Sequence, residues 1–298
     1  MKSRWLLNVG LLALLIALGL VAYFQPGAKR KPEQPAITNI DGAKVDTIRI
    51  EQPGHKTAVL KRERDHWQME QPVNARADDS VITSLLDDID ESSAHHYPVK
   101  GLDLKQFGLK PPKLSLTLNN ETLEFGSSDS LDHQRYIRNG DTVYLVNDTL
   151  FYRLQGDPLS MVSKRVLPKD AKITALDLPG IKLAQNSKGD WQLTPANNKI
   201  TSDQIQKLVD AWNNADAYNV KAAGDAPVAG TVTVAIAGRD KPLKFEIEKN
   251  DSVLALVRPD IGVEYQLPAN DRDDLLKFKP AEKPSKTSSN EKSTSSKK

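Results

Sequence analysis

The chain has 298 residues, no cysteine, and 41 Lys and Arg against 39 Asp and Glu, which gives a formal charge of +2. The lack of cysteine excludes a disulfide scaffold, a cysteine-ligated metal site and a thiol nucleophile. Residues 1–31 carry +5 and residues 279–298 carry +4, so the body between them carries −7. Nucleic-acid-binding domains cluster Lys and Arg on a folded face, so this acidic body predicts no nucleic-acid partner.

The N-terminal segment, residues 1–31, predicts a membrane anchor. Residues 5–24 form an uncharged, mostly apolar run, about as long as a helix that crosses the ~30 Å hydrocarbon layer. Aromatic residues stand at both ends of this run, where lipid headgroups lie. The alternative is a cleaved signal peptide with a small-x-small site at residues 17–19. Because the apolar run continues past that site, we expect one uncleaved transmembrane helix.

Charge does not orient this helix, because the positive residues on its two sides nearly balance. A short basic tail before an apolar run is the order of a signal sequence, which favours a body outside the cytoplasm. Residues 32–43 form a short Pro-containing linker. Residues 279–298 are rich in Lys, Ser and Thr. Such a segment buries too little apolar surface to fold, so we expect a disordered tail.

The body repeats one pattern. Residues 67–69, Trp-Gln-Met, recur 124 residues later as Trp-Gln-Leu at 191–193, and a proline follows each copy, at Pro72 and Pro195. Further matches, 120 to 123 residues apart, keep the same order along the chain. The sequence therefore predicts two copies of one unit, residues 44–167 and 168–278.

An amphipathic helix follows the tryptophan strand in each unit. In the first unit Asp78 or Asp79 can cap its N-terminus, and in the second Thr201 and Gln204 fit a capping box. An apolar stripe at helical spacing recurs in both units, at Val81, Ile82, Leu85, Leu86 and Ile89 in the first and at Ile205, Leu208, Val209 and Trp212 in the second.

The strands after each helix recur as well, because apolar and polar residues alternate with a period of two. The matched sets are Tyr97 and Val99 with Tyr218 and Val220; Leu114, Leu116 and Leu118 with Val232, Val234 and Ile236; Leu123 and Phe125 with Leu243 and Phe245; Ile137 and Arg138 with Val257 and Arg258; Val143 with Val263; and Tyr144 with Tyr265.

Turns and short helices complete the predicted unit. Asn139-Gly140 predicts a type I′ hairpin turn, which needs positive φ at both positions, and its counterpart is the looser segment 259–262. Helical stretches are expected at 148–154 and 158–165. Each unit is predicted as two or three short strands, one helix and a four-stranded antiparallel meander, so the fold class is α+β with two related tandem units behind one transmembrane helix.

Motifs for common chemistries are absent from the sequence. Phosphate-binding loops, dinucleotide fingerprints, serine-hydrolase elbows and zincin motifs do not occur. The histidines are His55, His66, His95, His96 and His133. Only the adjacent pair 95–96 invites a metal hypothesis, and neighbours in an extended segment point to opposite faces. We therefore interpret the pair as part of a solvated segment at the end of a helix.

Other polar and aromatic groups have structural interpretations. The acidic cluster of Asp87, Asp88, Asp90 and Glu91 lacks a calcium loop and fits a solvated helix face. Residues 126–130, Gly-Ser-Ser-Asp-Ser, precede a strand rather than a helix, so a loop in the meander is favoured over an anion site. Trp67 and Trp191 are expected in the core. Tyr136, Arg138 and Arg258 are possible contact residues. We predict no catalytic, cofactor or metal site.

The first unit resembles a known bacterial family, the domain of unknown function DUF4340. The resemblance runs from about residue 45 to 167 and rests on segments 65–72, 107–112, 123–126, 136–138, 143–146 and 163–167, the last being Ser-Lys-Arg-Val-Leu. The second unit lacks a Phe-Gly-Leu-x-Pro-Pro segment. The resemblance implies a membrane-anchored bacterial envelope protein, whose relatives are linked with ABC-type export systems as auxiliary subunits.

Two functional hypotheses follow. The first is a non-enzymatic accessory or scaffold subunit of an envelope transport complex, held in the inner membrane with its body in the periplasm and contacting protein partners. The second is a binding module, with the cleft between the two units holding an envelope lipid, glycan or peptide. A catalytic site built from scattered Asp, Glu and Ser is the least favoured reading.

Overall fold

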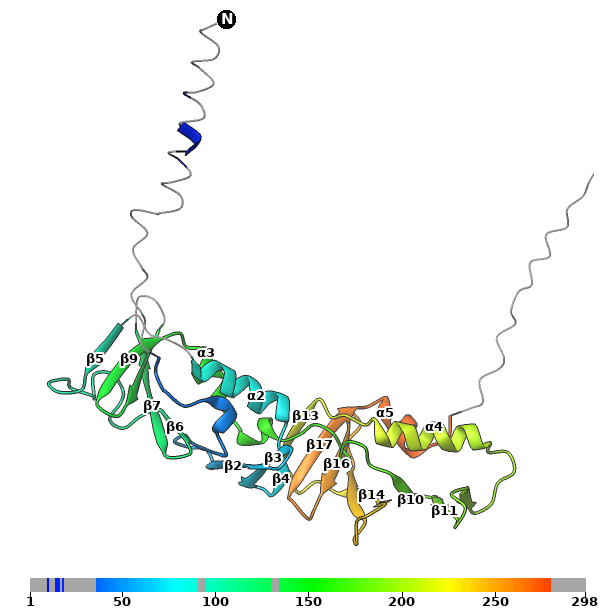
Figure 1. Cartoon of the computed structure of the whole chain (residues 1–298). Coiled ribbons are helices and arrows are strands. Elements are labelled where there is room, and N and C mark those ends of the chain that lie inside the picture. The colour runs from blue at the N-terminus through cyan, green and yellow to red at the C-terminus, as the bar shows by residue number, and fades with distance from the viewer. Residues whose placement is uncertain are drawn as a thin grey trace, which may run out of the picture.

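The computed structural model describes residues 36–90, 95–129 and 134–279, together with residues 10, 14–16 and 18. Within this part of the chain, two antiparallel sheets form an elongated body, and Figure 1 shows the helices α3, α2, α5 and α4 along one side of it. No helix among the described residues is long and apolar enough to cross a membrane. The predicted anchor, residues 5–24, and the tail beyond residue 279 lie outside the described residues apart from those few isolated positions.

The first sheet has nine strands in the order β4-β3-β2-β1-β6-β7-β8-β9-β5. Its strands are β1 (Thr47–Glu51), β2 (Ala58–Glu63), β3 (His66–Gln71), β4 (Ala75–Arg76), β5 (His95–Pro98), β6 (Leu114–Leu118), β7 (Glu121–Ser128), β8 (Arg135–Asn139) and β9 (Thr142–Val146). The hairpins before the helix and the meander after it are thus joined into one sheet by the pairing of β1 with β6.

The second sheet has eight strands in the order β12-β11-β10-β14-β15-β16-β17-β13. Its strands are β10 (Ile173–Leu178), β11 (Ile181–Gln185), β12 (Trp191–Thr194), β13 (Asn219–Ala222), β14 (Val228–Ile236), β15 (Leu243–Glu248), β16 (Val253–Arg258) and β17 (Val263–Pro268). Apart from β4, this order matches the first sheet strand for strand. The α+β class with two related units is therefore confirmed.

Pairing registers correct some of the residue matches made from sequence. Across the first sheet, Leu118 pairs with Ile48, Ile48 with Leu60, and Leu60 with Met69. Across the second sheet, Val234 pairs with Leu176, Leu176 with Leu183, and Leu183 with Leu193. Counted from this side, Leu118 corresponds to Val234. Counted from the next strand, where Leu116 pairs with Leu123 and Val234 pairs with Leu243, the predicted matches of Leu116 with Val234 and of Leu118 with Ile236 are kept. The registers on the two sides of this strand therefore differ by two residues between the units. A shift of two residues keeps every side chain on the same face, so alternation alone does not detect it.

The match of Tyr144 with Tyr265 agrees with the registers. Tyr144 pairs with Ile137 and Tyr265 pairs with Leu256. Leu256, rather than Val257, is consequently the counterpart of Ile137. On their other side, β9 pairs with β5 and β17 pairs with β13, so that His96 lies opposite Tyr144 and Val220 opposite Tyr265. The matches of Tyr97 with Tyr218 and Val99 with Val220 are therefore wrong by a few residues.

The hairpin turn between β8 and β9 lies one residue later than predicted. Asn139 still pairs with Thr142, so the turn residues are Gly140 and Asp141. Gly140 has φ of 54°, and Asp141 is not among the residues with positive φ. A glycine with positive φ at the first central position only is typical of type II′, not type I′. The counterpart loop, 259–262, ends at Gly262 with φ of 68°.

The main helix of each unit begins at a side-chain cap. Asp78, and not Asp79, caps α2 (Asp79–Asp87) by accepting from the backbone N–H groups of Ser80 and Val81. Thr201 caps α4 (Ser202–Asn213) with the predicted capping box to Gln204. Short helices complete the set: η1 (Gly42–Lys44), η2 (Asp88–Asp90), α3 (Thr149–Leu154), η3 (Pro158–Met161) and α5 (Asp271–Leu276).

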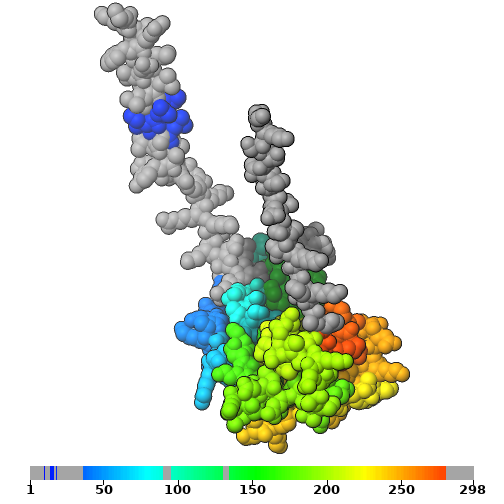
Figure 2. Space-filling model, turned by 90° about the vertical axis from the view of Figure 1, so that its right-hand side faces the viewer, coloured from blue at the N-terminus to red at the C-terminus, as the bar shows by residue number. Residues whose placement is uncertain are grey.

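The ends of the two units differ from the prediction. Of the stretch 158–165, only η3 is helical, and the residues after Met161 are extended. The second unit also ends in a helix, α5, which packs against α4. Figure 2 shows this pair from the end of the body, with the yellow-green residues of α4 beside the orange-red residues of α5. Both units therefore close with a helix after the last meander strand.

Buried apolar side chains of both units form one continuous core that runs from Ile37 to Leu275. Trp67 is buried, as expected, whereas Trp191 is half-buried and packs on the edge of the core. Ile37 is fully buried, and its carbonyl accepts a hydrogen bond from Asn139 Nδ2 at 2.8 Å. Residues of the predicted linker thus contribute to the first unit.

Candidate functional site

A cleft of about 730 Å³ lies where the two units meet. Its walls come from three parts of the chain: the β3–α2 region of the first unit, the segment 163–169 that connects the units, and loops of the second unit. The lining residues are His66, Gln68, Asn74–Ser80, Ser163–Lys169, Asp216, Ala217, Arg239, Arg258, Ile261 and Tyr265. Volumes of about 300–1,000 Å³ are typical of small-molecule sites.

Backbone hydrogen bonds hold the connecting segment between the two units. On the side of the first unit, the N–H of Asp78 donates to Met161 O at 2.8 Å and the N–H of Ser163 donates to Arg76 O at 2.9 Å. On the side of the second unit, the N–H of Val166 donates to Ala215 O at 3.0 Å, and the N–H of Ala217 donates to Lys164 O at 2.8 Å. The cleft floor is therefore fixed to both walls by regular hydrogen bonds.

Arg165 lies at the centre of this floor. Its Nη2 donates to the backbone oxygen of Asn213 at 2.7 Å, and its Nη1 lies 4.0 Å from Asp216 Oδ2, at the outer limit of an ion pair. Its Nε is buried and has no hydrogen-bond acceptor among the described residues. The side chain as a whole is 36% exposed, and its Nη1 has no hydrogen-bond acceptor among the described residues, so this guanidinium can donate to a ligand.

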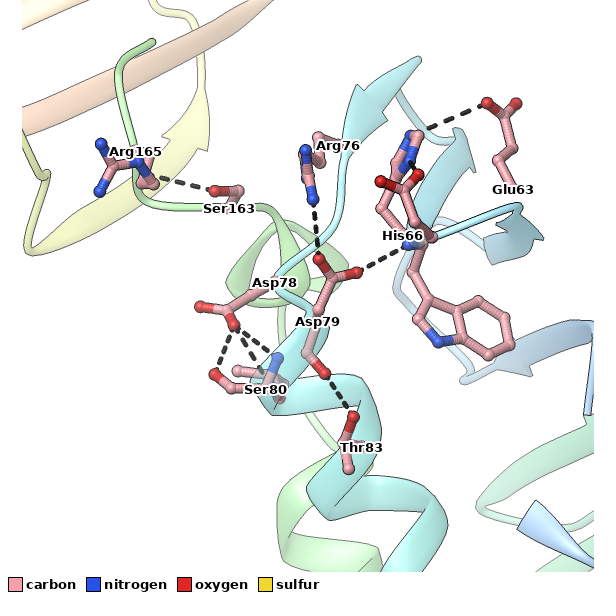
Figure 3. A network of polar contacts seen from close by, with 12 residues as sticks. Glu63, His66, Arg76, Asp78, Asp79, Ser80, Thr83, Ser163 and Arg165 are labelled. Atoms are coloured by element: carbon pink, nitrogen blue, oxygen red, sulfur yellow. Dashed lines mark hydrogen bonds and ion pairs between the residues drawn. The ribbon is translucent and has the colours of Figure 1, made fainter. Parts of the chain in front are cut away.

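The acidic side chains on the first wall are already bonded within the protein (Figure 3). Asp78 caps α2. Asp79 accepts from the backbone N–H of Trp67 at 2.7 Å and from Arg76 Nη2 at 3.0 Å. These carboxylates stabilise the start of α2, where negative charge is favourable, and they neutralise Arg76. They do not form a cation site.

The second wall contributes Arg258 and Tyr265. Arg258 makes two hydrogen bonds to Asp260, at 2.7 and 2.6 Å, and this bonding holds the pKa of Asp260 below its ordinary value. Tyr265 is only 5% exposed, and burial raises the pKa of its hydroxyl. That hydroxyl has no hydrogen-bond partner within the described ranges. A buried tyrosine usually bonds its O–H to a partner, so Tyr265 offers a free polar group to the cleft.

Positive charge dominates the cleft. Six Lys and Arg line it against three Asp, a formal balance of +3, within a body that carries −7. Arg76 and Arg258 are neutralised by their own aspartates. Lys164, Lys169 and Arg239 form no ion pair with any described residue, and all three are exposed. The excess of positive charge therefore resides in groups that are free to bind a ligand.

Comparison with known proteins identifies the family. The family model described as "Domain of unknown function (DUF4340)" matches residues 67–226, more than half of the chain.

The chain belongs to the DUF4340 family.

No curated protein and no solved structure matches it. The DUF4340 match begins at Trp67, later than the predicted resemblance, and extends into the second unit. It includes the first wall apart from His66, the connecting segment, and Asp216 and Ala217. The remaining residues of the second wall, Arg239, Arg258, Ile261 and Tyr265, lie beyond it.

The histidines do not come together. In this DUF4340 chain only His66 reaches the cleft, where it lies 3.1 Å from Asp65 and 3.8 Å from Glu63. His95 and His96 lie in the edge strand β5, so their assignment to a helix end is wrong. His55 lies between β1 and β2, and His133 is outside the described residues. Among the described residues, no group of three or more His, Cys, Asp or Glu is arranged to hold a metal ion.

The remaining candidates lie away from the cleft, with one exception. Asp88 binds Arg153 Nε at 2.6 Å, while Glu91 and Ser130 are outside the described residues. Residues 126–128 belong to β7, so their assignment to a loop is wrong. Tyr136 packs edge-on against Phe107, and Arg138 pairs with Glu124 at 2.6 Å. Of the possible contact residues, only Arg258 lines the cleft.

Sequence reasoning missed most of the cleft. Its residues span positions 66 to 265 and meet only through the packing of the two units. One local signal existed: the run Ser-Lys-Arg-Val-Leu at 163–167, which carries part of the DUF4340 resemblance and lies at the predicted boundary between the units. Two adjacent basic residues at such a junction were an available clue to a shared site.

Proposed function

We propose that this protein is a non-catalytic binding protein of the bacterial envelope that holds a ligand between its two units. The cleft is the observation that carries the proposal, because both units and the segment between them build its walls. Its free groups are cations and a hydroxyl, whereas Asp78 and Asp79 are bonded within the protein and Asp216 lies 4.0 Å from Arg165 Nη1. This arrangement suits binding, since general acid–base catalysis needs a free titratable pair.

In the wider proposal, residues 5–24 anchor the protein in the inner membrane and the body faces the periplasm. The protein then acts as an accessory subunit of an ABC-type export complex, as the family resemblance implies. The apolar length of residues 5–24 supports the anchor. A ligand bound in the cleft links the two functional hypotheses, because an accessory subunit can present its ligand to a transport complex.

Site-specific photo-crosslinking tests the binding role. A photoreactive amino acid replaces Lys169, which is exposed at the cleft, or Lys188, which is exposed in the turn between β11 and β12. We expect irradiated cells to give a defined adduct from position 169 and none from position 188. Equal labelling from both positions, or none from the cleft, would contradict the proposal.

The lack of cysteine permits a clean test of topology. Ser252→Cys places one thiol in the exposed loop between β15 and β16, and Ser3→Cys places one on the other side of the predicted anchor. A membrane-impermeant maleimide added to spheroplasts should label position 252 at once and position 3 only after lysis. The reverse pattern would place the body in the cytoplasm and reject the periplasmic assignment.

A further inference from the structure

We infer that the cleft between the two units binds a phosphate-bearing small molecule through Lys164, Arg165, Lys169, Arg239 and the Tyr265 hydroxyl. This inference rests on the proposed function, because it names the ligand class of the same cleft. It goes further by assigning the recognised group, an oxyanion, and the residues that contact it.

The first argument is charge. Three cations at the cleft, Lys164, Lys169 and Arg239, have no ion-pair partner among the described residues, although acids outnumber bases in the body as a whole. An isolated carboxylate carries one negative charge, whereas a phosphate monoester carries about −1.5 to −2 near neutral pH. Once Asp260, which pairs with Arg258, is counted with the lining residues, the excess is two positive charges, and a phosphate group matches it better than one carboxylate.

The second argument concerns donors that the fold leaves unused. The Arg165 guanidinium makes one hydrogen bond, from Nη2 to the backbone oxygen of Asn213; its Nη1 has no hydrogen-bond acceptor among the described residues, and the side chain is 36% exposed. Tyr265 is only 5% exposed, and its hydroxyl has no hydrogen-bond partner in the described part of the chain. Both groups line the same cleft. An oxyanion supplies the acceptors that both donors lack, and charge-assisted hydrogen bonds are the stronger kind.

The third argument is size and composition. A cleft of about 730 Å³ holds more than inorganic phosphate. Its floor and second wall also present apolar groups, from Val166, Leu167 and Ile261. The phosphate group is thus bound at the cationic residues while the remainder of a small organic phosphate, or of a phospholipid headgroup, lies against the apolar groups. These two sources share the chemistry, and the experiment separates them.

Calorimetric titration of the full-length protein in mild detergent tests the inference with four probes. Glycerol 3-phosphate represents a soluble phosphate, dihexanoyl phosphatidic acid represents the lipid source, glutarate offers two carboxylates, and glycerol is uncharged. We expect a phosphate probe to bind at least tenfold more tightly than glutarate, and glycerol not to bind. Tight binding of both phosphate probes indicates a soluble ligand, whereas binding of the phosphatidic acid alone indicates the lipid.

Matched variants locate the binding. K164Q/K169Q/R239Q should weaken the phosphate affinity by about fiftyfold or more, and Y265F by about threefold, since each loses hydrogen bonds to a charged group. The control K188Q/K241Q/K249Q removes the same charge from exposed positions outside the cleft and should leave the affinity within about twofold. Neither triple variant removes a described ion pair, so both should melt at the wild-type temperature.

Other results would overturn the inference. No binding of either phosphate probe, glutarate binding as tightly as phosphate, or equal loss in the control variant each rejects a phosphate site at this cleft. The proposed function fails separately, when photo-crosslinking at position 169 captures nothing. An adduct at that position together with no phosphate affinity would retain the binding role and reject only the ligand class.

Discussion

The two units share a strand order but differ in what fills the same core position. Arg135 pairs with Val146 in the first sheet, and the equivalent pair in the second is Leu254 with Leu267. Arg135 is 5% exposed and Leu254 is 0% exposed. A buried arginine and a buried leucine thus occupy one site of one topology. The alternation of apolar and polar residues is shared by both units, but each unit fills this core position with a different side chain.

The arginine is compensated by groups that the second unit does not have. Its guanidinium makes two hydrogen bonds with Asp148, including Nη2 to Oδ2 at 2.8 Å. It also donates to the carbonyl of Gly126 and lies 3.5 Å from the centre of the Phe151 ring. Leu254 needs only apolar neighbours. At this core position, the first unit consequently depends on a charge pair and the second does not.

Breaking this pair should give the largest effect. We expect Arg135→Leu to lower the free energy of unfolding by about 3–5 kcal/mol, because it leaves Asp148 buried and unpaired. The double variant R135L/D148A copies the second unit and should recover most of that loss. Urea unfolding followed by circular dichroism measures both. If R135L alone were neutral, the charge pair would not be important for the stability of the first unit.

The second difference is a close approach of backbone to a glycine in the first unit. Gly126 lies against the backbone oxygen of Phe107, and a Cβ there would also come within 3.0 Å of Leu109. We expect Gly126→Ala to lower the free energy of unfolding by about 1–3 kcal/mol through overpacking. Gly224→Ala is the matched control, since nothing lies within 4 Å of its added Cβ. A loss in G224A of similar size would show that the effect does not come from crowding.

The two helix caps allow a closer comparison. Asp78 accepts from two backbone N–H groups, at 3.0 and 3.3 Å, and adds negative charge at the start of α2. Thr201 accepts from Gln204 N at 3.3 Å without a charge. We expect Asp78→Ala to cost about 1–2 kcal/mol and Thr201→Ala about 0.5–1 kcal/mol of unfolding free energy. Thermal denaturation ranks the two, and a reversed order would contradict the charge argument.

The smallest expected effect is a pH dependence in the second unit. Burial, followed by the charge of Glu264, raises the pKa of Glu248 above its ordinary value of 4.5. The folded state then holds this proton to higher pH than the unfolded state, so the contribution of Glu248 to stability falls as pH rises above about 4.5. We expect Glu248→Gln to stabilise the protein at pH 7 by up to about 1 kcal/mol.

This gain should shrink as the pH is lowered below 4.5, where wild-type Glu248 is protonated in both states. Denaturant unfolding of both proteins at pH 4 and pH 7 measures the difference. Asp225→Asn, at an exposed carboxylate before β14, serves as the control and should show no such change. A gain for E248Q that is equal at both pH values would contradict the proposed protonation.

Local patterns predicted the elements better than their pairing. The capping box at Thr201, the helical stripes and the recurring tryptophan strand depend on near neighbours, and each was found in the structure. The matches of Tyr97 with Tyr218 and of Val99 with Val220 were misplaced by a few residues, because strand pairing depends on residues that are distant in the sequence. Asp148 and Arg135 belong to different elements, and no spacing in the sequence indicates that they meet. The duplication suggested a cleft between the units, but the residues that line it meet only through contacts between the units and no spacing in the sequence identified them.

The connecting segment has a consequence for how such a chain can evolve. Gene duplication makes a second copy of every strand and helix, so that either copy can drift while the other retains the original. The junction between the two copies, in contrast, occurs only once in the chain. Residues 163–166 are bonded to both units, so a chain with one unit would leave part of these backbone hydrogen bonds without partners. A binding site that depends on this segment therefore requires both units.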